Sequence, residues 1–137
     1  MEYKDILDKA FEAMENAYVP YSNWTVGAGL LTRQGTVYGG CNIENAAYTP
    51  TNCAERTAFF KAVSEGEREF TAIAIVGGVE DATEFDWCAP CGVCRQVMEE
   101  FCDESTFEIV LARSVEEYEV YTLGELLPKG FGPHNLQ

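Results

Sequence analysis

The spacing of hydrophobic and polar residues in the first half of the chain predicts two helices and a pair of strands. Residues 4–17 carry apolar side chains at helical spacing with charged side chains between them, which is typical of an amphipathic helix. Residues 25–32 and 36–43 are strand-like segments whose short separation is typical of a hairpin. Residues 52–65 predict a second helix, which Gly66 ends as a C-terminal cap.

The second half of the chain continues with strands and shorter helices. Residues 72–76 form a continuous apolar segment, typical of a central strand that is buried on both faces. Pro90 opens a third helix that extends through residue 101. Two more strands are predicted at residues 107–112 and 118–122, and Thr122-Leu123-Gly124-Glu125 is a capping box for a short final helix.

This order of elements predicts an α/β fold in which helices cover the faces of one five-stranded mixed sheet. Mixed strand directions are expected because a crossover helix joins parallel neighbours, whereas a hairpin joins antiparallel ones. The 137 residues fit a single domain over residues 1–137. Hydrophobic residues make up 47% of the chain and charged residues 23%, so a disordered protein is excluded.

The charge of the chain limits its partners. It has 23 acidic and 9 basic side chains, for a formal charge of −14. Nucleic-acid affinity comes largely from Lys and Arg side chains that replace counterions. No apolar segment reaches the roughly 18–20 residues that a membrane-spanning helix needs. We therefore expect neither a nucleic acid nor a membrane as partner.

The six cysteines and the single histidine narrow the chemistry. Residues 1–5 lack the basic and apolar regions of a signal peptide, so we expect a cytoplasmic, reducing location. There, clustered cysteines are metal ligands or redox groups more often than disulfides. With His134 as the one histidine, motifs that need two histidines are excluded. The chemistry is expected among cysteines and carboxylates.

Three cysteines stand at the starts of two predicted helices. Cys53-Ala54-Glu55 begins the second helix, and Pro90-Cys91-Gly92-Val93-Cys94 begins the third. Cysteines at positions i and i+3 of a helix lie on one face, which suits two ligands of one tetrahedral ion. Three thiolates with one open position are typical of catalytic zinc, and the positive end of a helix dipole favours the thiolate.

Each part of this pattern has a simpler interpretation. Asn52 and Glu55 could form a capping box, and Cys91-x-x-Cys94 could be a redox dithiol. Cys88, three residues before Cys91, could belong to a competing ligand set. The remaining cysteines, Cys41 and Cys102, are expected to be small buried hydrophobic residues.

Four segments together resemble a known family. They are residues 42–48 (NIENAAY), 53–58 (CAERTA), 90–97 (PCGVCRQV) and 125–128 (ELLP). In their order they are similar to the zinc-dependent nucleoside deaminases, and specifically to the small homotetrameric cytidine deaminases of the cytidine/deoxycytidylate deaminase superfamily. The resemblance implies a three-layer α/β/α fold and a cytoplasmic homotetramer with active sites at subunit interfaces. It also implies that a free pyrimidine nucleoside is the substrate, in pyrimidine salvage.

The resemblance assigns roles around one zinc ion per subunit. Cys53, Cys91 and Cys94 would hold the Zn²⁺, which activates water for attack on C4 of the pyrimidine. Glu55 would move protons from the water to ring N3 and then to the departing amine. Arg56 would donate hydrogen bonds to the ligand sulfurs and offset their charge. A surface ion pair is the simpler role for Arg56.

The resemblance also implies a set of substrate-binding residues. Asn42 and Glu44 would bind the ribose 3′-hydroxyl, although they could simply belong to a polar loop. Trp24 stands where relatives commonly have phenylalanine, and would stack on the pyrimidine. Tyr48 and Ala54 would also line the site.

Phe131 is similar to a C-terminal aromatic residue that enters a neighbouring subunit's site, although local packing is the simpler role.

Three other functions compete with deamination of cytidine and deoxycytidine. One is a blasticidin-type deaminase, and Asn42, Glu44 and Phe131 favour the plain nucleoside over it. Another is a nucleic-acid editing deaminase, which would need a basic binding path. The last is a structural zinc or dithiol module without catalysis.

Overall fold

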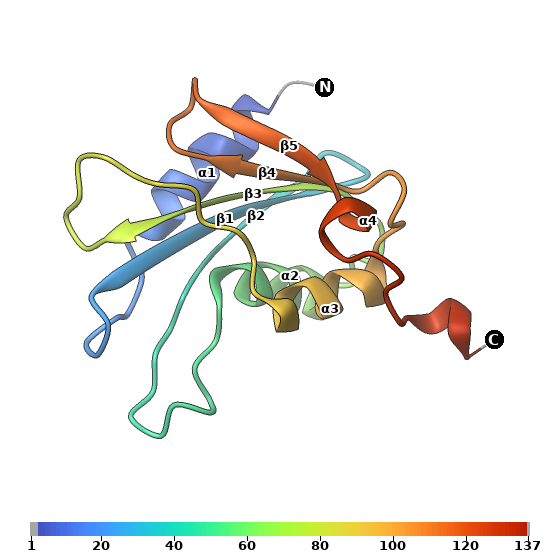
Figure 1. Ribbon diagram of the computed structural model, residues 1–137, viewed down its shortest axis with the longest axis horizontal. Coiled ribbons are helices and arrows are strands. Elements are labelled where there is room, and N and C mark those ends of the chain that lie inside the picture. Colours follow the sequence, from blue (N-terminus) through green and yellow to red (C-terminus); the bar gives the residue numbers. More distant parts are fainter. Residues whose placement is uncertain (1–2, 137) are drawn as a thin grey trace.

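The computed structural model describes residues 3–136 as one twisted sheet with helices on both faces (Figure 1). The strand order is β2-β1-β3-β4-β5. The strands are β1 (Trp24–Thr32), β2 (Val37–Cys41), β3 (Phe70–Val79), β4 (Glu108–Ala112) and β5 (Tyr118–Thr122). The helices are α1 (Lys4–Met14), α2 (Ala54–Ser64), α3 (Gly92–Phe101), α4 (Leu123–Leu126) and a 3₁₀ turn at Pro133–Asn135.

The strand directions are mixed, as the sequence predicts. β1 pairs antiparallel with both β2 and β3, and β4 pairs antiparallel with β5. β3 and β4 are parallel, and α3 lies in the connection between them. A parallel pair needs a crossover of this kind, whereas the β1–β2 hairpin needs only a short turn. The prediction of a five-stranded mixed α/β sheet is confirmed.

The helices lie in two layers on opposite faces of the sheet (Figure 1). α1 packs alone on one face through Ile6, Leu7 and Ala10, against a cluster that includes Ala74 and Val76 of β3. α2 and α3 pack on the other face, where buried side chains of both helices meet the sheet. These side chains are Ala54, Ala58, Phe59, Ala62, Cys94 and Met98, opposite Ala28, Leu30, Ile73, Ile75, Ile109 and Leu111.

Two glycine positions allow unusually close packing of helix on sheet. A Cβ atom at Gly27 of β1 would lie 1.9 Å from the Ala10 carbonyl oxygen of α1. A Cβ atom at Gly40 of β2 would lie 2.4 Å from the Ala54 carbonyl oxygen, at the start of α2. Any larger side chain would push the helices away. Gly40 therefore places the N-terminus of α2 directly against the sheet.

The element boundaries differ from the predictions in informative ways. β3 extends over Phe70–Val79, well beyond the predicted residues 72–76, because pairing with β1 continues along its length. α1 ends at Met14 rather than at residue 17. The third helix starts at Gly92, two residues after Pro90. Local apolar patterns show where an element lies, but sheet pairing decides how far it extends.

Two predicted helix ends are confirmed. Thr122 and Glu125 form the predicted capping box, with the Thr122 backbone N–H donating to Glu125 Oε1 at 2.8 Å. Gly66 adopts a left-handed φ of 101°, directly after α2, as expected of a C-terminal cap. Within residues 3–136, no helix is long and apolar enough to cross a membrane.

Candidate functional site

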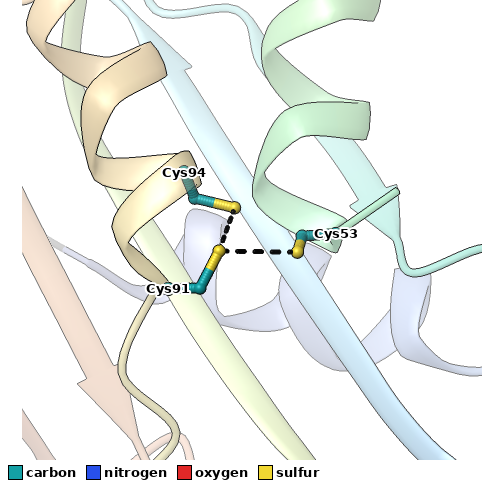
Figure 2. A group of neighbouring side chains, drawn as sticks. All are labelled: Cys53, Cys91 and Cys94. Carbon is teal, nitrogen blue, oxygen red and sulfur yellow. Dashed lines mark hydrogen bonds between the residues drawn. The ribbon is translucent and has the colours of Figure 1, made fainter. Parts of the chain in front are cut away.

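Three cysteine sulfurs converge between the starts of α2 and α3 (Figure 2). The Sγ atoms of Cys53 and Cys91 are 3.8 Å apart, and those of Cys91 and Cys94 are 3.4 Å apart. All three sulfurs lie within 4.8 Å of one another. Among the described residues, this is the one group of three or more Cys, His, Asp or Glu side chains with such spacing. The arrangement suits a single tetrahedral ion with one position left open.

Two of these cysteines are the N-caps of their helices. Cys53 caps α2 and Cys91 caps α3, each with an extended backbone conformation. The capping-box interpretation of Asn52 and Glu55 is wrong, because the N-cap of α2 is Cys53, whose side chain makes no capping hydrogen bond. The Asn52 amide instead donates to Thr57 Oγ1 at 3.2 Å, and that hydroxyl donates to the Cys53 carbonyl at 3.1 Å. These two bonds stabilise the backbone turn at the start of α2 that carries Cys53.

The electrostatics favour a thiolate at Cys53. The Cys94 thiol and the Arg56 guanidinium both lower the pKa of Cys53, to about 5. Arg56 Nη2 donates to Cys53 Sγ at 3.2 Å. Arg56 Nε is buried and has no hydrogen-bond partner within residues 3–136. A cation beside the sulfurs fits a three-thiolate ligand set, which carries one more negative charge than Zn²⁺ neutralises.

Glu55 lies beside the sulfur cluster on the first turn of α2. Its side chain is buried, with 4% of its surface exposed. Burial raises the pKa of Glu55 to about 7, and the charge of Cys53 adds to the effect. A carboxyl group in such a place can accept and release protons near neutral pH. Next to it, Ala54 is fully buried against Gly40.

The other cysteines lie outside the cluster. Cys88 is not part of the three-sulfur group, so the competing ligand set is not assembled. Burial raises the pKa of Cys88 to about 11. Cys102 packs against the core on the α2 and α3 side and is half-buried, as is Cys41. The prediction that Cys41 and Cys102 are small buried hydrophobic residues is met only in part, because each lies at the end of its element and is half-buried.

Asn42 bonds the start of β1, and Glu44 bonds the segment that leads into it. The Asn42 side chain bonds the β1 backbone twice, accepting from Val26 N at 2.9 Å and donating to Trp24 O at 2.8 Å. Glu44 Oε1 accepts from the backbone N–H groups of Tyr21 at 3.0 Å and Ser22 at 3.1 Å. The two side chains thus hold the loop that carries Trp24.

Ser22 is a contributor that the sequence patterns did not single out. Its hydroxyl donates to Glu44 Oε2 and accepts from Trp24 N at 3.0 Å. The bond from the Ser22 hydroxyl lowers the pKa of Glu44, and the two bonds together connect Glu44 to Trp24. A serine two residues before the start of a strand is a signal for such a turn, but a weak one.

Tyr48 lies in a loop close to the same segment. Its ring meets that of Tyr21 edge to face, with the centroids 6.3 Å apart. Tyr48 and Asn23 both adopt a left-handed φ, of 64° and 58°, which is uncommon for residues other than glycine. The loops that carry Trp24 and Tyr48 are therefore shaped by specific backbone geometry.

The C-terminal segment is tied to α3 by hydrogen bonds from Arg95 and Gln96, two residues of the 90–97 motif. Arg95 donates to Pro90 O at 2.8 Å and to Leu126 O at 2.9 Å. Gln96 Nε2 donates to Phe131 O at 2.7 Å. Because α3 carries two of the cysteines, these bonds set the C-terminal segment relative to the sulfur cluster. The Phe131 side chain itself is exposed.

Known proteins are similar to this chain in sequence and in fold. A cytidine deaminase of Sporosarcina psychrophila is 48% identical over 136 residues, which cover 99% of this chain and 96% of that protein. A cytidine deaminase of Halalkalibacterium halodurans is 47% identical over 96% of this chain and 95% of its own length. A crystal structure of cytidine deaminase from Burkholderia pseudomallei superposes with a TM-score of 0.85 at 47% identity, covering 96% of this chain and all of that one.

The matched family region contains the whole sulfur cluster. Residues 1–109 match the family described as the cytidine and deoxycytidylate deaminase zinc-binding region. Cys53, Cys91 and Cys94 lie inside these residues and present three sulfurs at ligand spacing. The chain therefore belongs to the cytidine and deoxycytidylate deaminase family of zinc-binding enzymes.

Proposed function

We propose that this enzyme hydrolyses cytidine and deoxycytidine to uridine and deoxyuridine, releasing ammonia, as a step of pyrimidine salvage. The observation that carries the proposal is a buried carboxyl group, Glu55, beside three convergent cysteine sulfurs. The relatives with 48% and 47% identity over nearly the whole chain carry the name cytidine deaminase. Hydrolytic deamination of a cytosine base needs a metal ion to activate water and a carboxylate to transfer protons, and a three-cysteine site beside a carboxylate can provide both.

Cys53, Cys91 and Cys94 would hold one Zn²⁺ per chain. The bound ion supplies Lewis acidity, which lets water act as a nucleophile near neutral pH. Arg56 stabilises the thiolate of Cys53 through the 3.2 Å bond to its sulfur. The positive dipole ends at the starts of α2 and α3 also stabilise the negative charge of the sulfurs.

Glu55 performs the proton transfers in this mechanism. It accepts a proton from the attacking water and delivers it to ring N3 as the new C–O bond forms at C4. It then passes the second proton of the water to the amino group, and ammonia leaves as the C4–N bond breaks. A carboxyl group with its pKa near 7 can serve as base and as acid in one turnover.

The ribose and base would be held by residues outside the metal centre. Asn42 and Glu44 are proposed to contact the 3′-hydroxyl, and Trp24 to stack on the pyrimidine. Tyr48 and Ala54 would complete the surface around the nucleoside. The bonds from Tyr21 and Ser22 to Glu44, and from Trp24 to Ser22, support this proposal because they keep Glu44 and Trp24 close to each other.

A panel of substrates tests the reaction. The loss of cytosine absorbance is followed with cytidine, deoxycytidine, CMP and blasticidin S, at equal enzyme and zinc concentrations. We expect turnover of the two nucleosides and little turnover of CMP, because the acidic chain offers no general attraction for phosphate. Fast turnover of CMP alone, or of blasticidin S alone, would contradict the nucleoside assignment.

We further propose a cytoplasmic homotetramer of single-domain subunits, with active sites at the subunit interfaces. A reducing location keeps the ligand cysteines as thiols. Phe131 and Val93 are exposed apolar side chains close to the elements that carry the cysteines, which supports burial of this surface by another subunit.

Native mass spectrometry tests the tetramer and its zinc content together. In a second experiment, the Glu55→Gln and Phe131→Ala variants are each dissociated, and their subunits are mixed and then reassembled into mixed tetramers. If Phe131 serves a neighbouring site, the mixture recovers activity that neither variant has alone. No recovery in confirmed mixed tetramers would place Phe131 outside the neighbour's site.

A further inference from the structure

The C-terminal segment lies on α3 through two glycines that flank Phe131. Gly132 has an extended backbone, with φ −149° and ψ −169°, and successive residues of an extended chain face opposite sides. Gly130 and Gly132 face α3, because a Cβ atom on either glycine would lie 2.9 Å from an atom of the Glu99 side chain. Phe131, between them, therefore faces away from α3, and its side chain is exposed.

Gln96 and Glu99 form the surface of α3 that meets this segment. They are three residues apart, so their side chains lie on one face of the helix. Gln96 Nε2 donates to the Phe131 carbonyl oxygen at 2.7 Å. Glu99 lies under the flanking glycines and is buried, with 4% of its surface exposed. The backbone is thus in contact with α3 at three successive residues, of which Phe131 is the middle one.

The Glu99 carboxyl group does not hold the segment through a hydrogen bond of its buried oxygen. Within residues 3–136, Oε1 of Glu99 is buried and has no hydrogen-bond partner. Burial raises the pKa of Glu99, and the nearby charge of Glu104 adds to the effect, so the neutral acid is favoured. What the side chain supplies at this place is volume, because it fills the space beneath both glycines.

We propose that Glu99 is a positioning residue for Phe131, because its side chain sets the distance of the 130–132 backbone from α3 and thereby the place of the Phe131 ring. This inference rests on the proposed function, in which Phe131 completes a neighbouring subunit's site. A shorter side chain at residue 99 removes the support below both glycines. A larger residue in place of Gly132 lifts the segment, because its Cβ would overlap Glu99 Cγ.

The expected kinetic effect lies in substrate binding rather than in chemistry, because the sulfur cluster is at the other end of α3. Loss of an interaction made equally in the ground state and the transition state raises KM and leaves kcat unchanged. We expect Glu99→Ala to raise KM for cytidine by about tenfold, the low end for a misfit in an apolar site, with kcat within about twofold.

Two further variants separate volume from charge. Glu99→Gln keeps the volume of the side chain and removes its charge, so it should retain the affinity that Glu99→Ala loses. Glu100→Ala, at the next and exposed position of α3, is the matched control. An equal rise in KM for Glu99→Gln and Glu99→Ala would overturn the proposal, because the effect would then come from the charge.

A double-mutant cycle tests the contact between Glu99 and Gly132. Alanine can adopt the extended backbone of residue 132, and the nearest atom to its Cβ would be Glu99 Cγ. KM is measured for the wild type, Gly132→Ala, Glu99→Ala and the double variant. Removal of Cγ makes room for the new methyl group, so the double variant should have a lower KM than the two single effects multiplied together. Independent positions multiply within about twofold, and that result would overturn the proposal.

Hydrogen exchange provides a second readout that does not depend on turnover. Amide exchange over residues 129–136 is measured by mass spectrometry in the wild type, Glu99→Ala and Glu100→Ala. Loss of the support under the segment should make this region exchange faster in Glu99→Ala and leave it unchanged in Glu100→Ala. Circular dichroism and zinc content confirm that each variant is folded.

The outcomes separate this inference from the proposed function. If the wild type does not deaminate cytidine, the proposed function fails, whereas hydrogen exchange still reports whether Glu99 supports the segment. If cytidine is deaminated but Glu99→Ala leaves the exchange over residues 129–136 unchanged, the inference fails. A fall in kcat with unchanged KM in folded, zinc-loaded Glu99→Ala would also overturn it, because Glu99 would then act on the metal centre.

Mixed tetramers show whether Glu99 acts on its own site or on a neighbour's. Glu99→Ala subunits are reassembled with Glu55→Gln subunits, which are expected to be inactive but have an intact Glu99. If Glu99 places Phe131 for a neighbouring site, active sites next to Glu55→Gln subunits should show the wild-type KM. A KM that stays uniformly high in confirmed mixed tetramers would overturn the proposal.

Discussion

The metal centre and the nucleoside-facing residues of this protein are built in different ways. Cys53 and Cys91 are caps of helices that pack against the sheet, and Glu55 is on the first turn of α2. By contrast, the aromatic side chains proposed to surround the nucleoside are exposed. Trp24, Tyr48 and Phe131 are 40%, 73% and 59% exposed in the single chain.

This difference indicates that one chain assembles the chemical centre, whereas recognition depends on loops and on neighbouring surfaces. Close packing at Gly40 and the buried side chains of Ala54, Glu55 and Cys94 restrict the cysteines to one arrangement. The loops around Trp24 and Tyr48 are held by a few hydrogen bonds and one aromatic contact. Changes in the metal centre should therefore affect zinc content and kcat, and changes in the loops should affect KM.

The largest effect is expected from removal of a proposed ligand. Cys91→Ala leaves two sulfurs, so we expect the variant to lose bound zinc. Activity should fall by more than about 10³-fold, since several kcal/mol of transition-state stabilisation are lost with the ion. Zinc is measured by inductively coupled plasma mass spectrometry and activity by cytidine absorbance.

Cys102→Ala is the matched control for this change, and should keep both zinc and activity because Cys102 lies outside the sulfur group. Cys88→Ala should keep its zinc. A zinc-free Cys88→Ala protein would restore the competing ligand set and weaken the distinction between the two regions.

Glu55→Gln is expected to separate zinc binding from catalysis. The amide retains the shape of the side chain but cannot transfer protons, so kcat should fall by about 10²–10⁴-fold, the usual contribution of general acid–base catalysis. Zinc content should remain at one ion per chain. Glu65→Gln, at the exposed end of the same helix, should retain full activity. An active Glu55→Gln variant would favour the structural zinc module.

Glu44→Ala tests the recognition side. The loss of a hydrogen bond to a charged group costs about 1.5–3 kcal/mol, so KM for cytidine should rise by roughly 10–100-fold. The same variant is assayed with 3′-deoxycytidine, which lacks the hydroxyl that Glu44 is proposed to bind. If Glu44 only holds the Tyr21–Ser22 loop, the variant will lose equal affinity for both substrates.

The smallest effect is expected from Arg56→Ala, which should change zinc affinity. Removal of the guanidinium leaves the Cys53 sulfur without its 3.2 Å donor, but the sulfur ligands remain. Zinc affinity, measured by competition with a chelator, should fall by about tenfold, the low end for residues that support metal ligands. Arg68→Ala is the control, since Arg68 is exposed and, among residues 3–136, bonds only backbone carbonyls. Unchanged zinc affinity in Arg56→Ala would remove Arg56 from the metal centre.

Much of the fold and of the metal centre could be predicted because the signals are local. The i, i+3 spacing of Cys91 and Cys94 on a helix is enough to bring their sulfurs to 3.4 Å. Thr122 and Glu125 form the reciprocal hydrogen bonds of a capping box within one helical turn. A strand-like segment and a continuous apolar segment show where β1 and β3 lie, although the lengths of these strands depend on partners distant in sequence.

The contacts among loops could not be predicted in this way. Nothing in the pattern around Ser22 shows that its hydroxyl joins Glu44 to Trp24. The Asn52 interpretation was wrong because the tertiary structure starts α2 one residue later and uses Asn52 to hold Thr57. Such bonds depend on where two segments meet, which local propensity does not encode.

The sequence by itself determined the types of residue and the local geometry: the order of strands and helices, the helix-start cysteines and the carboxylate next to them. Only the tertiary structure decided that Cys53, 38 residues from Cys91, lies 3.8 Å from it, and that Cys88 stays outside the sulfur cluster. The physical reason is that helical spacing acts over a single turn. The meeting of α2, α3 and β1 depends on burying one shared face of the sheet.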